Sequence, residues 1–432
     1  MRFRYNPEMN LPDVFGLLGG LLALAFLANR LFRITRVPDV IVLMAVGLAL
    51  GPGLHLVDAS SLKPVTDFFG TLALVLILFQ GGLELEVRDT VRHFPAGLLL
   101  SVYAYLLSTM FVAYVFHRNQ GSSIETALLV GGVFGCTSSA IILPVLQQIE
   151  VSKPVRITML LDASLSDTLA VLMVGILLTL HVSGGQIASQ FLEQIAFQFS
   201  VSTAVALLAA FAWSYLLPVM SEQRFWQALT FSAVLLLYAG MEWIHANGLI
   251  AVLIFGLGIA NFHRLNRNTL APTLGSEPAS GHAQIHHFHS ELAFLVRSFF
   301  FVLIGLIVDL KGLLHYGLLV GGLVGALALA RWLAVRATWW AWRDAGPLEK
   351  ELPMWIQPRG LITVVLALQV IEARGPSFNF LIQVAFAVVL ATNILVIIGS
   401  IRASRIAARA AAAPALERAH LAVQEKGSST LG

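Results

Sequence analysis

The chain has 432 residues, of which 57% are hydrophobic and 12% are charged, and its formal net charge is +3. Soluble domains carry about 25% charged residues, so this composition excludes an ordinary soluble globular protein. The small positive charge reflects how Lys and Arg are distributed between apolar segments, so it gives no reason to expect a nucleic-acid partner.

Apolar segments follow one another along the chain, each near the roughly 20 residues that cross a membrane as a helix. They lie at about 11–32, 38–57, 65–83, 95–116, 123–148, 156–180, 195–219, 226–244, 247–262, 290–310, 314–342, 353–371 and 378–401. We therefore predict an all-α polytopic membrane protein with about 13 transmembrane helices over residues 1–401, followed by a tail at 402–432.

Lys and Arg concentrate in every second connection between these segments. The rich connections contain Arg30, Arg33, Arg36, Arg88, Arg92, Lys153, Arg156, Arg224, Arg264, Arg267, Arg343 and Lys350, and the tail adds Arg402, Arg405 and Arg409. The alternate connections are nearly bare. Because cytoplasmic loops hold this excess, we predict a multi-pass plasma membrane protein, in a bacterium one of the inner membrane, with the N-terminus outside and the C-terminus in the cytoplasm.

One connection, at about 263–289, is long and polar, and its Pro and Gly content predicts a flexible cytoplasmic loop. Its end is rich in histidine, with His282, His286, His287 and His289. Imidazoles titrate near neutral pH, so the loop could sense cytoplasmic acidity or hold a metal. A loop also tolerates histidines that have no role.

Two carboxylates lie within the sixth apolar segment, at Asp162 and Asp167. A charged side chain at the centre of a membrane helix costs at least roughly 2.5–3.5 kcal/mol, so it is expected to face a polar cavity or a positive partner. The pair therefore predicts a proton or ion site.

Two apolar segments are interrupted by residues that break helices. The fifth contains Gly135-Cys136-Thr137-Ser138-Ser139-Ala140 and then Pro144, and the twelfth contains Gln357-Pro358-Arg359-Gly360. The breaks occupy equivalent places in the two halves of the chain, spans one to six and eight to thirteen. This pattern predicts two inverted-topology repeats whose discontinuous helices cross at a site near the membrane midplane.

The motif Asp162-Ala163-Ser164-Leu165-Ser166-Asp167 resembles the ion-site helix of the monovalent cation:proton antiporters, the sodium/proton exchanger superfamily. Further similarity comes from Leu78-Phe79-Gln80-Gly81-Gly82-Leu83-Glu84-Leu85, Phe299-Phe300-Phe301-Val302-Leu303-Ile304-Gly305-Leu306, Arg331 and Arg359-Gly360. The resemblance covers roughly residues 11 to 400. It implies a secondary active transporter, a homodimer in the lipid bilayer, that exchanges Na⁺, with K⁺ or Li⁺ as alternatives, for H⁺.

The same resemblance implies a role for each matching residue. Asp167 would bind the cation or the proton, with Ser166, Thr137, Ser138 and Gln80 as further positions of the binding site. Asp162 would form a structural ion pair with Arg331. Arg359 would compensate the partial charges at the helix breaks.

The resemblance also implies a division of the chain into two bundles. A core bundle, about 95–180 and 314–401, would move against a scaffold and dimer bundle, about 11–83 and 195–310. Proton and cation would compete for one carboxylate, and the loaded core would give alternating access to the two sides. No cofactor, and no metal beyond the transported cation, is expected.

Departures from the family pattern leave several points open. Ser166 replaces the usual Asn or second Asp, which favours one-for-one exchange, and Ser138 replaces an Asp of the electroneutral branch. Ion choice, stoichiometry and pH set point therefore do not follow from the resemblance. An anion or organic-solute carrier, or a channel, built on the same fold is the alternative. An enzyme is not expected, because no nucleophile motif or metal-ligand spacing lies near the carboxylates.

Overall fold

The computed structural model describes residues 11–35, 37–54, 63–84, 87–149, 151–182, 188–220, 225–266, 278–343 and 345–402. Within these ranges the regular elements are all helices, which confirms the predicted all-α class. They are α1 (Leu11–Thr35), α2 (Asp39–Leu48), η1 (Ala49–Gly53), α3 (Lys63–Glu84), α4 (Val87–Gln120), α5 (Ile124–Gly135), α6 (Ser139–Gln148), α7 (Lys153–Val182), α8 (Ala188–Met220), α9 (Trp226–Trp243), α10 (Gly248–Asn266), α11 (Pro278–Ile307), α12 (Leu310–His315), α13 (Gly317–Ala337), η3 (Trp339–Trp342), α14 (Pro347–Trp355), α15 (Leu361–Arg374), η4 (Pro376–Phe378) and a last helix at 380–402.

Seven helical segments in the described ranges are long and apolar enough to cross a membrane. Four shorter apolar helices lie at Gly19–Leu31, Asp39–Gly53, Phe68–Leu83 and Gly248–Phe262. The protein is thus a multi-pass membrane protein, whereas the number of thirteen crossings stays a prediction.

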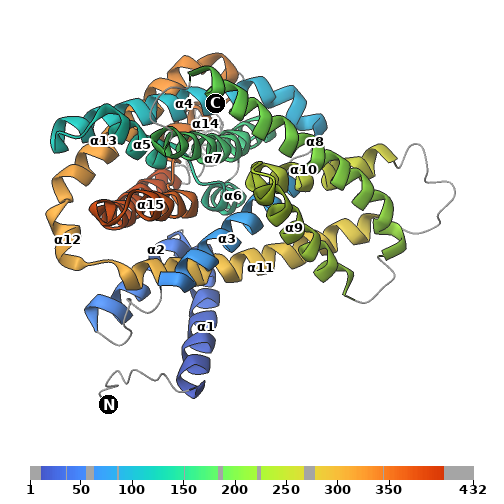
Figure 1. The fold of residues 1–432 in the computed structure, drawn as a ribbon, viewed down its shortest axis with the longest axis horizontal. Helices are drawn as coiled ribbons and strands as arrows, with labels where there is room; N and C mark the ends of the chain where they lie inside the picture. The colour runs from blue at the N-terminus through green and yellow to red at the C-terminus, as the bar shows by residue number, and fades with distance from the viewer. Residues whose placement is uncertain are drawn as a thin grey trace, which may run out of the picture.

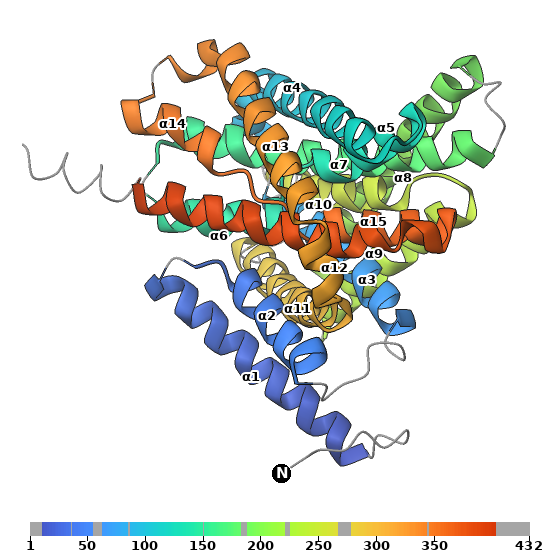
Figure 2. The same ribbon diagram turned by 90° about the vertical axis from the view of Figure 1, so that its left-hand side faces the viewer.

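The helices pack in two groups. In one group, α4 packs along α5, α7 and α13; in the other, α3 packs along α10 and α11, and α11 packs along α2. Figure 1 shows α6 and α15 between these groups, and Figure 2 shows α1, α2 and α11 on one side and α4, α5 and α13 on the other. The division into a moving core and a static scaffold stays a prediction.

Helices α2 and α11 approach each other so closely that only glycine fits between them. A Cβ on Gly47 would lie 2.1 Å from the carbonyl oxygen of Val302, and one on Gly305 would lie 2.4 Å from that of Met44. Small residues of this kind let membrane helices pack backbone against backbone. The two helices therefore form one tightly packed unit.

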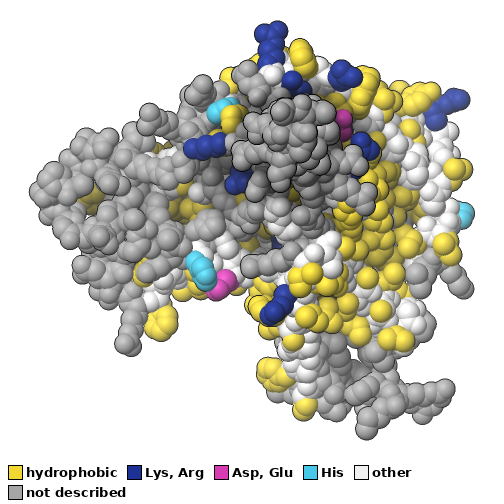
Figure 3. Space-filling model, turned by 180° about the vertical axis from the view of Figure 1, so that it is seen from behind, with side chains coloured by type: hydrophobic (Ala, Val, Ile, Leu, Met, Phe, Trp, Pro, Cys, Tyr) yellow, Lys and Arg dark blue, Asp and Glu magenta, His cyan; other side chains and the backbone are white. Residues whose placement is uncertain are grey.

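Basic side chains mark one face of the molecule. Figure 3 shows Lys and Arg side chains gathered along the upper part of this face, with apolar side chains over the flank. Arg336, Arg343 and Arg402, near the ends of α13, η3 and helix 380–402, are exposed. We predict that this face lies in the cytoplasm, from the same excess of Lys and Arg.

The histidines that we placed in a loop lie in a helix, so that placement is wrong. Helix α11 begins at Pro278 and includes His282, His286, His287 and His289. His289 is buried, and its ring lies edge-on to Phe79 at 4.8 Å between centroids. The aromatic packing of His289 fixes this end of the segment inside the protein, which its composition did not indicate. Residues 267–277 lie outside the described residues.

Candidate functional site

Two helices are interrupted and cross at their interruptions. Residues 136–138 separate α5 from α6, and residues 356–360 separate α14 from α15. The Ser138 N–H donates to the Pro358 carbonyl at 2.8 Å, which joins the two breaks directly. A Cβ on Gly360 would lie 2.3 Å from the Ser138 hydroxyl oxygen, so this glycine leaves room for the crossing. The predicted discontinuous helices are present at both places.

Arg359 lies buried at the crossing and donates to carbonyls at the ends of two half-helices. Its Nε donates to Phe134 O at 2.7 Å and its Nη2 to Gly135 O at 3.4 Å, both at the end of α5. Its Nη1 donates to Gln357 O at 3.2 Å, just beyond α14. Helix C-termini carry a partial negative charge. The guanidinium is therefore placed where it can neutralise two such ends.

Asp167, on α7, faces the start of α6. Its Oδ2 accepts from the Ser139 hydroxyl at 2.8 Å and from the Ser139 N–H at 3.3 Å. Its Oδ1 is buried and makes no hydrogen bond within the described part of the chain. One carboxylate oxygen is thus held at the positive end of a half-helix, and the other is left for a proton or a cation.

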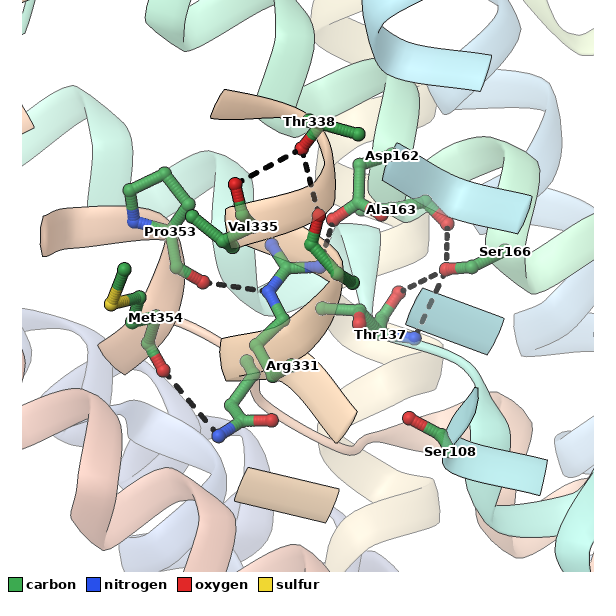
Figure 4. A network of polar contacts seen from close by, with 12 residues as sticks. Ser108, Thr137, Asp162, Ala163, Ser166, Arg331, Val335, Thr338, Pro353 and Met354 are labelled. Atoms are coloured by element: carbon green, nitrogen blue, oxygen red, sulfur yellow. Dashed lines mark hydrogen bonds and ion pairs between the residues drawn. The ribbon is translucent and has the colours of Figure 1, made fainter. Parts of the chain in front are cut away.

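Asp162, five residues earlier on α7, pairs with Arg331 on α13. The Nη1 to Oδ2 distance is 2.6 Å, and the two side chains are 1% and 0% exposed. Arg331 also donates from Nε to the Pro353 carbonyl at 2.6 Å. Figure 4 shows Arg331 reaching between Asp162 and Pro353. The pair cancels two charges and connects α7, α13 and α14.

Ser166 and Thr137 hold α7 against the first break. The Thr137 N–H donates to Ser166 Oγ at 3.1 Å, and this hydroxyl donates to Ala163 O at 3.0 Å. Figure 4 shows the Ser166 hydroxyl between these two residues. The Thr137 hydroxyl lies 3.5 Å from Arg359 Nη1. The role of Ser166 and Thr137 in binding a cation stays a prediction.

A cavity of about 670 Å³ leads from the surface to the first break. Its lining includes Gln80 on α3, Ser139 and Ala140 on α6, Ser164 on α7, and Glu291 and Arg297 on α11. His287 and Glu291, at the start of the apolar part of α11, form an exposed pair at 3.4 Å. Because the cavity ends at Ser139, which donates to Asp167, water and ions could approach the carboxylate from this side.

Three side chains that we did not place in the site belong to it. Ser139, rather than Ser138, donates to Asp167. Thr392 Oγ1 accepts from the Arg359 N–H at 3.0 Å, and Asn393 Nδ2 donates to Arg359 O at 3.0 Å, so helix 380–402 holds the second break in place. The signal for Thr392 and Asn393 was present in the sequence as two polar residues within an apolar segment.

Arg297, near the start of the predicted span 290–310, is a further charged side chain at the cavity. It lines the cavity, pairs with Asp39 at 2.8 Å and donates to Ala140 O at 2.8 Å. The partners are distant in the sequence, so only the fold brings them together.

A helical membrane domain in which two broken helices cross beside a buried carboxylate defines a secondary transporter of the inverted-repeat class. The family of transmembrane sodium/hydrogen exchangers matches residues 21–401, so the chain belongs to this family. The family resemblance is thereby confirmed, and so is the expectation of a transporter rather than an enzyme.

Curated relatives and a solved structure agree with this assignment. The Na⁺/H⁺ antiporter 1 of Methanocaldococcus jannaschii is 25% identical over 339 residues, 76% of each chain. The K⁺/H⁺ antiporter NhaP2 of Shewanella oneidensis is 25% identical over 391 residues, which cover 87% of this chain and 64% of that one. The structure of the sodium proton antiporter MjNhaP1 from M. jannaschii at pH 8 matches with a TM-score of 0.72 at 21% identity, over 92% of this chain and 97% of that one.

Proposed function

We propose that the protein is an antiporter that exchanges a monovalent alkali cation for protons at Asp167. Na⁺ is the first candidate, with K⁺ and Li⁺ as alternatives. The relatives' names, Na⁺/H⁺ and K⁺/H⁺ antiporter, support exchange of a cation for protons. The choice of cation is left to experiment, since the named relatives differ in it.

The observation that carries the proposal is the setting of the Asp167 carboxylate. It is 1% exposed, one oxygen is held by Ser139, and the other makes no hydrogen bond in the described structure. A buried carboxylate is stable in a membrane only when a proton or a cation neutralises it. Because either one occupies the same oxygen, binding of one excludes the other, and this competition couples the two fluxes.

The surrounding charges favour one-for-one exchange. Asp162 and Arg331 neutralise each other, and Arg359 faces the negative ends of α5 and α14. Asp167 is then the one carboxylate of this buried cluster whose charge can change during a cycle. One proton replaced by one monovalent cation leaves the charge of the loaded site unchanged, so the exchange is electroneutral.

Access alternates because the site lies between two groups of helices. The cavity is lined on one side by α3 and α11 and on the other by α6 and α7. A shift of α4–α7, α13–α15 and helix 380–402 against α1–α3 and α8–α11 would close this cavity and open the site to the opposite side. In this proposal the cavity faces the cytoplasm, the N-terminus lies outside, and the protein is a homodimer.

The test is proton flux in proteoliposomes loaded with a pH-sensitive dye. Na⁺, Li⁺, K⁺ and choline are added in turn to wild-type protein, to Asp167→Asn and to Asp309→Asn. Asp309 is an exposed aspartate that accepts from the Gly312 N–H at the start of α12, so it is a matched control for the change from acid to amide.

We expect an alkali cation, but not choline, to drive proton movement in the wild type and in Asp309→Asn, and none in Asp167→Asn. A valinomycin-clamped membrane potential should leave the rate unchanged if exchange is electroneutral. If Asp167→Asn still exchanges, competition at this carboxylate is wrong. Transport of an anion or organic solute without an alkali cation would favour the carrier alternative.

A further inference from the structure

Pro144 leaves one carbonyl of the broken helix without its helical donor. In an α-helix the N–H of residue 144 would donate to the carbonyl of Ala140, four residues earlier. Proline has no N–H, so this bond cannot form. The free carbonyl lies in the first turn of α6 (Ser139–Gln148), one residue after Ser139.

Arg297, on another helix, supplies the missing donor. Its Nη1 donates to Ala140 O at 2.8 Å, and its Nη2 donates to Asp39 Oδ2, also at 2.8 Å. The Arg297 and Asp39 side chains are 12% and 9% exposed. A planar guanidinium can donate to both acceptors at once. The bond to Asp39 therefore fixes the orientation in which Arg297 donates to the Ala140 carbonyl.

The contact joins the two groups of helices. Asp39 and Arg297 belong to α2 and α11, which are packed backbone to backbone at Gly47 and Gly305. Ala140 belongs to α6, which packs on α7. The next residue back, Ser139, donates to Asp167. A chain of three polar contacts thus runs from the α2–α11 unit to the ion-site carboxylate.

We infer that Arg297 is a positioning residue that docks α11 onto the carbonyl freed by Pro144 and thereby holds the cavity-open arrangement. The inference rests on the proposed function, in which α6 moves relative to α2 and α11. Since the contact spans the two groups, it breaks when the cavity closes. Its loss removes a stabilising interaction from the cavity-open state and lowers the population of that state.

A second effect of Arg297 has the opposite sign. A guanidinium that lines the cavity repels an entering cation, so its removal alone would lower the cation KM. Asp39→Asn separates the two effects, because it leaves the positive charge in place but weakens its anchoring. Docking predicts that Arg297→Gln and Asp39→Asn both raise the cation KM on the cavity side, whereas pure repulsion predicts changes in opposite directions.

Pro144→Ala provides an independent variant that leaves Arg297 and Asp39 intact. It restores the N–H of residue 144, which can then donate to Ala140 O within α6 and compete with the guanidinium. If docking on this carbonyl matters, Pro144→Ala reproduces the effect of Arg297→Gln, and the double variant shows no further change. The cation KM of Arg297→Lys should lie between those of the wild type and Arg297→Gln, because an ammonium cannot match both acceptors with the same planar geometry.

The matched control is Arg156→Gln. Arg156 Nη2 also donates to a carbonyl of α6, that of Leu146, at 3.1 Å. Arg156 lies on α7, which belongs to the same group of helices as α6, so this bond is expected to survive the movement. Its loss should leave access to the cavity unchanged.

The experiment measures access directly. Ser164 lines the cavity, so Ser164→Cys, in a chain with Cys136→Ser, is labelled with a membrane-impermeant maleimide from the cavity side. A hydrogen bond to a charged group corresponds to about a tenfold shift in the equilibrium between the two states. We expect labelling to slow by up to about tenfold in Arg297→Gln, Asp39→Asn and Pro144→Ala, with the cation KM raised in each.

Unchanged labelling in Pro144→Ala and Arg297→Gln, in protein that remains monodisperse, would overturn the inference. Opposite KM changes in Arg297→Gln and Asp39→Asn would assign Arg297 to charge repulsion instead. A wild type that exchanges no cation would contradict the proposed function, while the labelling rates would still report on the docking contact.

Discussion

Removing one member of the Asp162–Arg331 pair should destabilise the protein strongly. In Asp162→Asn the Arg331 guanidinium, 1% exposed, keeps its bond to Pro353 O but loses the carboxylate at 2.6 Å. Loss of one partner of a buried ion pair leaves an uncompensated charge and costs ~3–5 kcal/mol. We expect a clearly lower midpoint in thermal unfolding of the detergent-solubilised protein, together with reduced yield.

The double variant Asp162→Leu with Arg331→Met tests the cause. It removes both charges and fills the site with apolar side chains, so it should recover most of the stability that Asp162→Asn loses. Because the pair is assigned a structural role, cation-dependent proton flux should return with stability. A wild-type midpoint in Asp162→Asn would refute the reasoning, and so would a double variant less stable than Asp162→Asn.

Three further predictions concern the ion site. The Ser139 hydroxyl donates to Asp167 at 2.8 Å and thereby favours the ionised form of this carboxylate. Ser139→Ala removes this donor, so the pH of half-maximal exchange should move upward by about one unit. Ser298→Ala, which removes a hydroxyl bonded within α11, is the control in the same flux assay. Gly360→Ala places a Cβ 2.3 Å from Ser138 Oγ, so it should lower the free energy of unfolding by ~1–3 kcal/mol and abolish exchange. Gly346→Ala is the control, because its Cβ would have no neighbouring atom within 4 Å, and it should change neither thermal unfolding nor flux. Competition between one proton and one cation predicts that the cation KM rises up to about tenfold for each unit of pH decrease in the acid range; a KM independent of pH in that range would contradict a shared site.

The breaks could be predicted from sequence because their signal is local. Gly, Ser and Pro within an apolar segment weaken a helix wherever they occur, and the two clusters lie at matching places in the halves. The choice between Ser138 and Ser139 could not be predicted. It depends on α6 beginning at Ser139, which turns that residue's N–H and hydroxyl toward Asp167.

Contacts between distant segments account for the other differences. Arg297 lies near the predicted end of a span, where a basic side chain usually extends to the membrane surface. Its acceptors come from α2 and α6, and the bond to Ala140 exists because Pro144 removes a donor. Likewise, His289 packs among aromatic rings from other helices, which composition alone does not reveal. Local composition predicted these residues' chemistry but not their partners.

The two charged groups at the crossing divide the half-helix ends between them. Arg359 donates to carbonyls at the negative ends of α5 and α14, and Asp167 accepts from Ser139 at the positive end of α6. A cation at Asp167 therefore meets a carboxylate that a helix N-terminus already stabilises in its ionised form. This lowers the advantage of the proton over the cation at the same oxygen. Competition between them requires such a balance, because a carboxylate buried without these donors would stay protonated and carry no cation.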